Sequence, residues 1–95
     1  MTKIIAIVPT EHGWKYLQQL CKHWAHKLEV ELGEQKGTVK FSEATAIMTS
    51  DASTLTVEIE AVSAEVLERM KGVVSSHLDR FAFREAPLPF EWKAA

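Results

Sequence analysis

The strictest pattern in the chain is an alternation of apolar and polar side chains over residues 54–61. Leu55, Val57 and Ile59 alternate with threonine and glutamate. This period of two places the apolar side chains on one face of a β-strand and the polar side chains on the other. A strand of this kind needs a covering layer on its apolar face only. The segment therefore predicts a sheet that is buried on one side and open to water on the other.

Two other segments repeat apolar residues at spacings of three and four, which is typical of amphipathic helices. The first helix is expected after Pro9, with Thr10 capping it, and the second after Ser63, which is expected to cap that helix. The apolar stripe of the first helix contains Trp14, Leu17, Leu20, Cys21, Trp24 and Leu28, and that of the second contains Val66, Leu67, Met70, Val73, Val74, Leu78 and Phe81.

Shorter apolar or alternating runs predict the remaining strands, and they give the element order β-α-β-β-β-β-α. This order indicates an α+β fold, a two-layer sandwich in which both helices pack on one face of an antiparallel meander sheet. Near the end of the chain, Pro87 and Pro89 confine any C-terminal strand to an edge of the sheet. The expected strands are residues 3–8, 28–32, 39–41, 44–49 and 54–61, with a polar turn at residues 33–37 and alternation again over residues 88–93.

Composition limits the class of protein. The 95 residues are expected to form a single domain, 1–95, and the formal net charge of −2 lacks the basic excess that nucleic-acid binding needs. No apolar run approaches the ~18 residues of a membrane span. A single cysteine closes no internal disulfide, and no signal peptide is apparent. We therefore expect a cytoplasmic protein that binds neither nucleic acid nor membrane.

Three residues close in sequence, Cys21, His23 and His26, suggest a metal site. Cys21 belongs to the apolar stripe and points away from both histidines on a regular helix, so it is interpreted as a small core residue. His23 and His26 are three positions apart and can converge on one ion, but a metal site needs a third ligand from elsewhere. They are either surface histidines or ligands of iron, haem or zinc. No cofactor is predicted from the residues alone.

His77 lies within the apolar stripe of the second helix, where a buried ring must find a hydrogen-bond partner or border a cavity. One interpretation is a core histidine bonded to a backbone carbonyl or to Tyr16. The other is a pocket residue, with Tyr16, His77 and Phe81 lining a seam between the two helices.

Residues 79–85 (DRFAFRE) place Arg80 and Arg84 near the end of the second helix. Their charge complements the negative end of the helix dipole, and guanidinium groups also bind carboxylates by two-point contacts. The sequence thus leaves open a structural role and an anion-binding role for the two arginines. In either case Asp79 and Glu85 are expected to neutralise them.

Residues 16–27 (YLQQLCKHWAHK) together with residues 77–85 (HLDRFAFRE) resemble the bacterial Domain of Unknown Function 2218 (DUF2218) family over essentially the whole chain. The resemblance implies no catalytic residues, because the family has no established activity. Domains of this kind are associated with siderophore-interacting, ferric-reductase-like proteins. The resemblance therefore implies a role in iron or siderophore handling and a siderophore-interacting enzyme as partner.

Two functions follow from these patterns. The first is a non-catalytic binding or accessory module, whose ligand residues would be Tyr16, His77, Arg80 and Arg84. The second is a protein–protein interaction or dimerisation domain without a small-molecule ligand, because an unpaired strand edge can pair with another chain. No acid, base and nucleophile occur in a recognisable arrangement, so no catalytic site is predicted.

Overall fold

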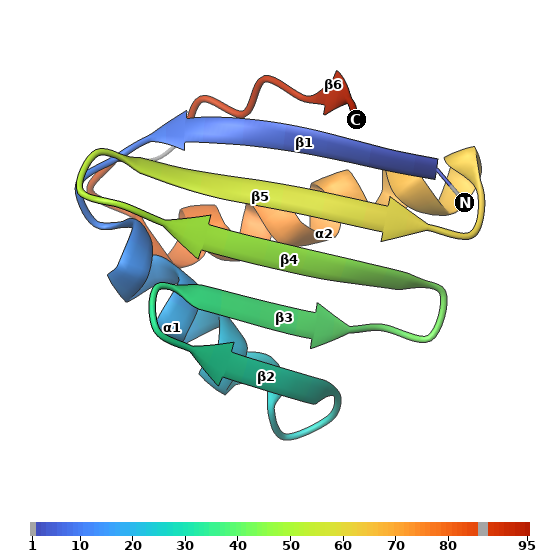
Figure 1. The fold of residues 1–95 in the computed structure, drawn as a ribbon, viewed down its shortest axis with the longest axis horizontal. Coiled ribbons are helices and arrows are strands. Elements are labelled where there is room, and N and C mark those ends of the chain that lie inside the picture. Colours follow the sequence, from blue (N-terminus) through green and yellow to red (C-terminus); the bar gives the residue numbers. More distant parts are fainter. Residues whose placement is uncertain (1, 86–87) are drawn as a thin grey trace.

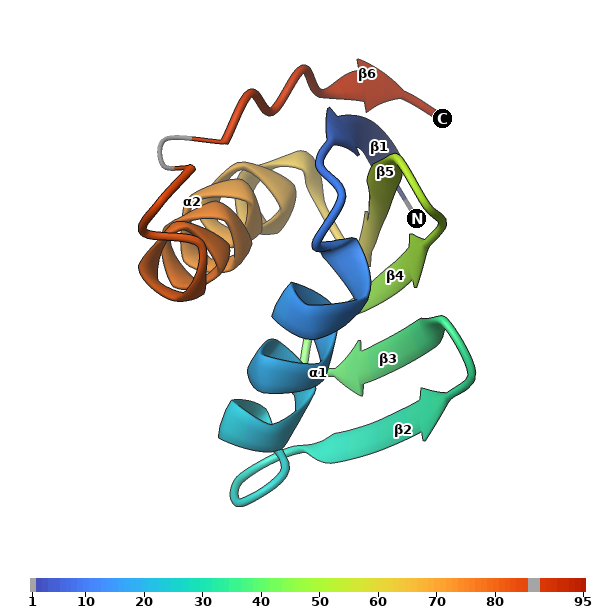
Figure 2. The ribbon, with the colours of Figure 1, turned by 90° about the vertical axis from the view of Figure 1, so that its left-hand side faces the viewer.

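A computed structural model describes residues 2–85 and 88–95 of the protein. These residues form an antiparallel six-stranded sheet in the order β2-β3-β4-β5-β1-β6. Two helices cover one face of it (Figures 1 and 2), which confirms the predicted α+β two-layer fold. The elements are β1 (Thr2–Pro9), α1 (Gly13–Trp24), β2 (Glu29–Gly33), β3 (Lys36–Lys40), β4 (Ala44–Ser50), β5 (Thr54–Ala61), α2 (Ala64–Phe81) and β6 (Lys93–Ala94).

The centre of the sheet is β5, which occupies the residues that the alternation predicted. Leu55, Val57 and Ile59 are fully buried beneath the helices, whereas the intervening threonines and glutamates are half-buried on the open face. β1 pairs with β5 along its whole length, from Thr2 opposite Ala61 to Pro9 opposite Thr54. β1 therefore lies between β5 and β6, and it adds to the β5 edge of the meander formed by β2 to β5 (Figure 1).

The β2–β3 hairpin is tighter than the predicted turn at residues 33–37. Gly33 and Lys36 pair across the hairpin, so Glu34 and Gln35 alone form the turn. Gln35 has a φ of 58°, and positive φ values of this kind are typical of two-residue hairpin turns because they match the twist of the strands.

The predicted Thr10 cap of the first helix is wrong. α1 begins at Gly13, its N-cap is His12, and no side chain caps it. The Thr10 hydroxyl instead accepts a hydrogen bond from the N–H of His12, the residue directly before the helix, at 3.1 Å. Thr10 is buried and lies against Glu85, in the segment that follows α2.

The predicted Ser63 cap of α2 is confirmed. The Ser63 hydroxyl accepts a hydrogen bond from the Val66 N–H at 3.2 Å, which satisfies one of the free donors at the helix start. The expected apolar stripe faces the sheet: Val74 and Leu78 are fully buried and Met70 nearly so. Burial of side chains of this size contributes roughly 1.5–3 kcal/mol each to folding.

The end of the chain supplies the predicted edge strand, but it is shorter than the alternation suggested. β6 contains only Lys93 and Ala94, which pair with Ile5 and Ile4 of β1. Pro89 precedes it in a segment without regular structure. Pro87 lies outside the described residues.

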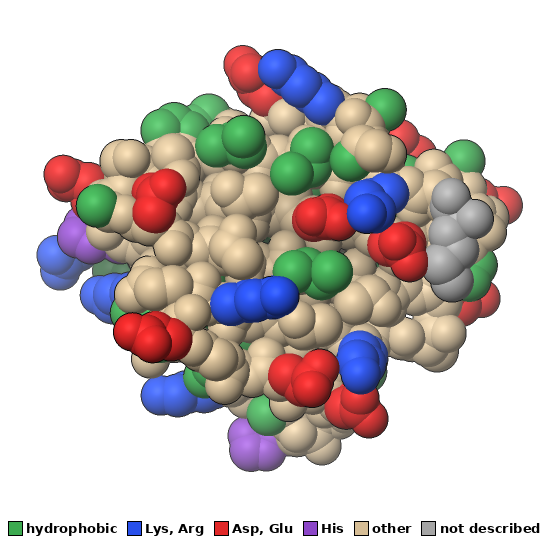
Figure 3. Space-filling view, viewed as in Figure 1, with side chains coloured by type: hydrophobic (Ala, Val, Ile, Leu, Met, Phe, Trp, Pro, Cys, Tyr) green, Lys and Arg blue, Asp and Glu red, His purple; other side chains and the backbone are tan. Residues whose placement is uncertain are grey.

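The open face of the sheet carries acidic and basic side chains in alternation (Figure 3). Lys3 pairs with Glu58 at 3.0 Å and Lys40 with Glu29 at 2.8 Å. These pairs are solvent-exposed and contribute little to stability. In the described part of the chain, neither helix is both long enough and apolar enough to span a membrane.

Candidate functional site

The two helices meet where α1 begins and α2 ends, and a hydrogen-bond network joins them there. The Thr10 hydroxyl lies 3.0 Å from both carboxylate oxygens of Glu85, and the Tyr16 hydroxyl donates to Oε2 of the same carboxylate. Tyr16 and Thr10 are both buried, whereas Glu85 is exposed. Glu85 thus fixes the segment that follows α2 against the first turn of α1.

Burial, and secondarily the hydrogen bond and charge of Glu85, raises the pKa of Tyr16 to about 12. The phenol is therefore neutral at physiological pH and acts as a hydrogen-bond donor. A group held in this state does not serve as a base or nucleophile, because its anionic form is disfavoured.

A hollow of about 160 Å³ opens beside this network, and we call it the Tyr16–Arg84 pocket. The Arg84 guanidinium lies 5.7 Å from the centroid of the Phe83 ring, within cation–π distance. The Phe83 side chain is 72% exposed, so its ring is accessible from solvent. The pocket is lined by Lys15, Tyr16, Phe81, Phe83 and Arg84. It therefore combines two cationic groups with three aromatic rings, one of which is the buried phenol of Tyr16.

The structure separates the two arginines of the predicted anion site. Arg84 lines the pocket, whereas Arg80 is exposed and does not. The expected neutralisation by Asp79 and Glu85 is wrong: within residues 2–85 and 88–95, neither arginine forms an ion pair of 4 Å or less. Asp79 instead accepts a hydrogen bond from the Leu88 N–H at 2.9 Å, and Glu85 accepts from Thr10 and Tyr16. Both acids hold the C-terminal segment in place.

His77 lies in a separate aromatic cluster further along the helices. Its Nδ1 is 2.6 Å from the carbonyl oxygen of Val73, so the predicted bond to a backbone carbonyl is present. Its ring centroid lies 4.9 Å from that of Trp24 and 5.4 Å from that of His23. The predicted bond from His77 to Tyr16 is wrong, because the Tyr16 hydroxyl is taken by Glu85.

The predicted seam of Tyr16, His77 and Phe81 is therefore divided into two parts. Phe81 lines the Tyr16–Arg84 pocket and also lies 6.0 Å from the ring of His23, centroid to centroid. Tyr16 belongs to the first part and His77 to the second, with Phe81 between them.

His23 and His26 do not lie on one helix, because α1 ends at Trp24, so their spacing of three does not place them on one helical face. His23 lies in the last turn, whereas His26 is exposed in the turn that follows. Among residues 2–85 and 88–95, no group of three or more histidine, cysteine, aspartate or glutamate side chains is placed to hold a metal ion. Cys21 is a buried free thiol whose pKa is raised by burial, in agreement with its interpretation as a core residue.

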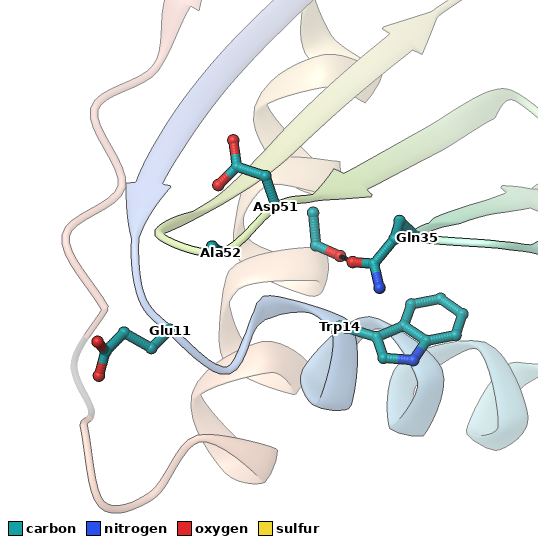
Figure 4. Close-up of a pocket in the computed structure, with 6 residues that line it drawn as sticks. Glu11, Trp14, Gln35, Asp51 and Ala52 are labelled. Atoms are coloured by element: carbon teal, nitrogen blue, oxygen red, sulfur yellow. Dashed lines mark hydrogen bonds between the residues drawn. The ribbon is translucent and has the colours of Figure 1, made fainter.

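A second, wider hollow of about 500 Å³ lies beside Trp14 of α1, and no sequence pattern indicated it. Its acidic groups do not converge: Figure 4 shows Glu11, Asp51 and the Trp14 indole pointing in different directions. The Asp51 carboxylate already accepts the N–H groups of Ser53 and Thr54, each at 2.8 Å. This hollow is a weaker candidate for a binding site than the Tyr16–Arg84 pocket.

Sequence reasoning identified Tyr16 and Arg84 but missed Lys15, Phe83 and the Thr10–Glu85 contact. One usable signal was the position of Tyr16 beside the apolar stripe, because a buried tyrosine hydroxyl usually has a hydrogen-bond partner. The choice of Glu85 as that partner depends on where the chain runs after α2, which no local pattern specifies.

Comparison with known proteins identifies relatives but no activity. A family model described as "Uncharacterized protein conserved in bacteria (DUF2218)" matches residues 5–93. The solved NMR structure of PA4090 from Pseudomonas aeruginosa is 30% identical in sequence, with a TM-score of 0.84; the match covers 98% of this chain and 96% of that one. No curated protein matches the chain.

Proposed function

The chain belongs to the DUF2218 family, and from the chemistry of its Tyr16–Arg84 pocket we propose that it is a non-catalytic module that binds a small aromatic anion. We base this proposal on one observation: Lys15, Arg84 and the exposed ring of Phe83 line the same hollow. A guanidinium group binds a carboxylate by two parallel hydrogen bonds, and an aromatic side chain stacks on a flat ring. A carboxylate on an aromatic ring offers both features.

The size of the pocket limits the ligand. At about 160 Å³, the hollow is smaller than the ~300–1,000 Å³ of sites that enclose a drug-sized molecule. It suits one ring with its acidic substituent, either as a free small molecule or as one arm of a larger ligand that extends into solvent.

The charges around the pocket favour an anion. Glu85 is the acidic group nearest to Tyr16, and its carboxylate accepts hydrogen bonds from Tyr16 and Thr10. Lys15 and Arg84 carry two positive charges against the one negative charge of Glu85, so the potential at the opening is positive.

The specific form of the proposal is a role in iron or siderophore handling, with a ferric catecholate as ligand. A catecholate is a flat aromatic anion, which is the chemistry that the pocket suits, and the resemblance of the chain implies the same role. The proposed compartment is the reducing cytoplasm, in which a free thiol such as Cys21 stays reduced. The proposed partner is a siderophore-interacting enzyme that receives the ligand.

The test is a titration of ¹⁵N-labelled protein with benzoate, 2,3-dihydroxybenzoate and the ferric complex of the latter. We expect saturable shifts at the amides of Lys15, Tyr16 and Arg84. Arg84→Gln should weaken binding roughly 10- to 100-fold, the equivalent of about 1.5–3 kcal/mol for a charged hydrogen bond. Arg80→Gln is the matched control, because Arg80 is an exposed arginine in the last turn of α2, outside the pocket, and this variant should bind as the wild type does.

Two results would contradict this function. One is a set of shifts that maps elsewhere on the molecule, and the other is an equal loss of affinity in Arg80→Gln and Arg84→Gln. Equal losses would mean that the ligand responds only to net charge.

The second candidate is an interaction or dimerisation domain, and the exposed edge of the sheet favours it. β2 is an edge strand with four of its five residues exposed, and the open face also presents Ile7 with 59% of its surface accessible. An unpaired edge can add a strand from a second chain. Light scattering from micromolar to millimolar concentration tests self-association directly. A monomer throughout that range would reject the homodimer.

A further inference from the structure

The rings of His23, on α1, and His77, on α2, lie close together, with centroids 5.4 Å apart and ring planes tilted by 46°. His23 lies in the last turn of α1 and His77 in the second half of α2. We propose that this pair is a binding site for an exchangeable divalent transition-metal ion, with two imidazole ligands from the protein, fewer than the three or four that hold a resident ion, and water in the remaining positions.

The hydrogen bond of His77 prepares it as a ligand. A carbonyl oxygen only accepts hydrogen bonds, so the contact of 2.6 Å with Val73 requires a proton on Nδ1 of His77. In the neutral ring the lone pair then resides on Nε2. Histidines that bind metals nearly always have their other nitrogen bonded in this way, which fixes the tautomer and the orientation of the ring.

The separation of the two rings fits a shared ion. For metal–nitrogen bonds of 2.0–2.1 Å in tetrahedral geometry, two ligating imidazoles have centroids about 5 Å apart. The observed 5.4 Å is close to this value, and rotation of the His23 ring about its side-chain bonds would direct one of its nitrogens at Nε2 of His77. His23 is exposed and can make this rotation, whereas His77 is half-buried against Trp24 and held by Val73.

The ligand set also defines the class of ion. In the described part of the chain no third histidine, cysteine or carboxylate joins the pair, so selection depends on imidazole alone. Imidazole suits copper, nickel and zinc, whereas calcium and magnesium prefer oxygen ligands. We expect Cu²⁺ to bind most tightly, followed by Ni²⁺ and Zn²⁺, since divalent affinities generally peak at copper.

The test uses the full chain with CuCl₂, NiCl₂, ZnCl₂ and MgCl₂. Isothermal titration should give one ion per chain for the first three and no binding for MgCl₂. Cu²⁺ should quench tryptophan fluorescence, because Trp24 lies 4.9 Å from His77, and Zn²⁺ should raise the melting temperature by linking the two helices. His23→Gln and His77→Gln should each weaken binding about tenfold or more. His26→Gln is the matched control and should bind as the wild type does.

Several results would overturn the proposal. Binding that survives His77→Gln but is lost in His26→Gln would assign the ion to the two histidines near the end of α1. Binding that survives each single histidine change would indicate a site elsewhere, and no binding by the wild type would reject the site outright. His23→Gln changes an exposed side chain, so circular dichroism should show an intact fold. Arg84→Gln should leave metal binding unchanged, which separates this site from the Tyr16–Arg84 pocket.

Discussion

Gly37 offers the sharpest test of how α1 packs on the sheet. Gly37 lies in β3 directly beneath α1, and a Cβ atom there would lie 2.6 Å from Cys21 Sγ and 2.8 Å from Leu17 Cδ1. Both neighbouring side chains are fully buried and have little room to move. Any residue larger than glycine must therefore push these side chains into the packed core or displace the helix or the strand.

The expected cost of Gly37→Ala follows from two opposing effects. Overpacking in a well-filled core typically destabilises by about 1–3 kcal/mol. Replacing glycine by alanine also reduces the freedom of the unfolded chain, which stabilises by about 0.4–1 kcal/mol. We expect a net loss of about 1–2 kcal/mol in the free energy of unfolding, together with an unchanged fold.

Urea denaturation followed by circular dichroism measures this loss. Gly72→Ala is the control, because Gly72 lies on the exposed face of α2 with no atom within 4 Å of an added Cβ. That change should stabilise by about 0.8–1 kcal/mol. The double variant Cys21→Ala with Gly37→Ala should lose less stability than the sum of the single changes, because the nearer clashing atom is gone. A Gly37→Ala protein as stable as the wild type, or strict additivity in the double variant, would refute the packing argument.

Three further outcomes concern single groups. The pKa of Tyr16 is raised to about 12, so the stability that its neutral phenol contributes should persist up to the ordinary pKa of 10.0 and decline as the pH rises towards 12. Absorbance at 295 nm follows the ionisation of this residue, which is the only tyrosine in the chain. A Tyr16 that ionises near pH 10 would contradict its burial. Ser63→Ala should lower the free energy of unfolding by about 1 kcal/mol through loss of the α2 cap, measured by urea denaturation against Ser75→Ala, a change elsewhere on that helix that should cost less. Hydrogen bonds from the N–H groups of Ser53 and Thr54 lower the pKa of Asp51. The wild type should therefore be more stable than Asp51→Ala at neutral pH, and this difference in the free energy of unfolding should shrink as the pH falls below about 4. A difference that does not change with pH would show that the carboxylate charge contributes nothing.

Much of the fold could be predicted because its signals are local. The alternation of β5 and the stripe of α2 depend on neighbours within one element, and Ser63 caps a helix that starts beside it. The start of α1 was misplaced for a non-local reason. Thr10 has the side chain of a cap, but its hydroxyl lies against Glu85. A contact between residues far apart in sequence outweighed the local preference.

The candidate site was predicted only in part, for a related reason. Helical phase correctly placed His77 near the seam between the helices, but the angle and shift between the helices decide which rings meet. His77 therefore lies against His23 and Trp24 and not against Tyr16. The resemblance in the two motifs identified the family, but the partners of Tyr16 required the path of the chain after α2.

The position of β1 between β5 and β6 has a consequence for biosynthesis. β1 is made before the other strands of the sheet, yet its main partner is residues 54–61, which lie 45 to 59 residues further along the chain. Until those residues leave the ribosome, the run Ile4, Ile5, Ala6, Ile7 and Val8 has no strand to pair with. Long-range pairings of this kind slow folding and leave β-prone segments exposed to other chains. We therefore expect closure of β1 on β5 to compete with aggregation through β1 during synthesis, and a faster appearance of β5 to raise the yield.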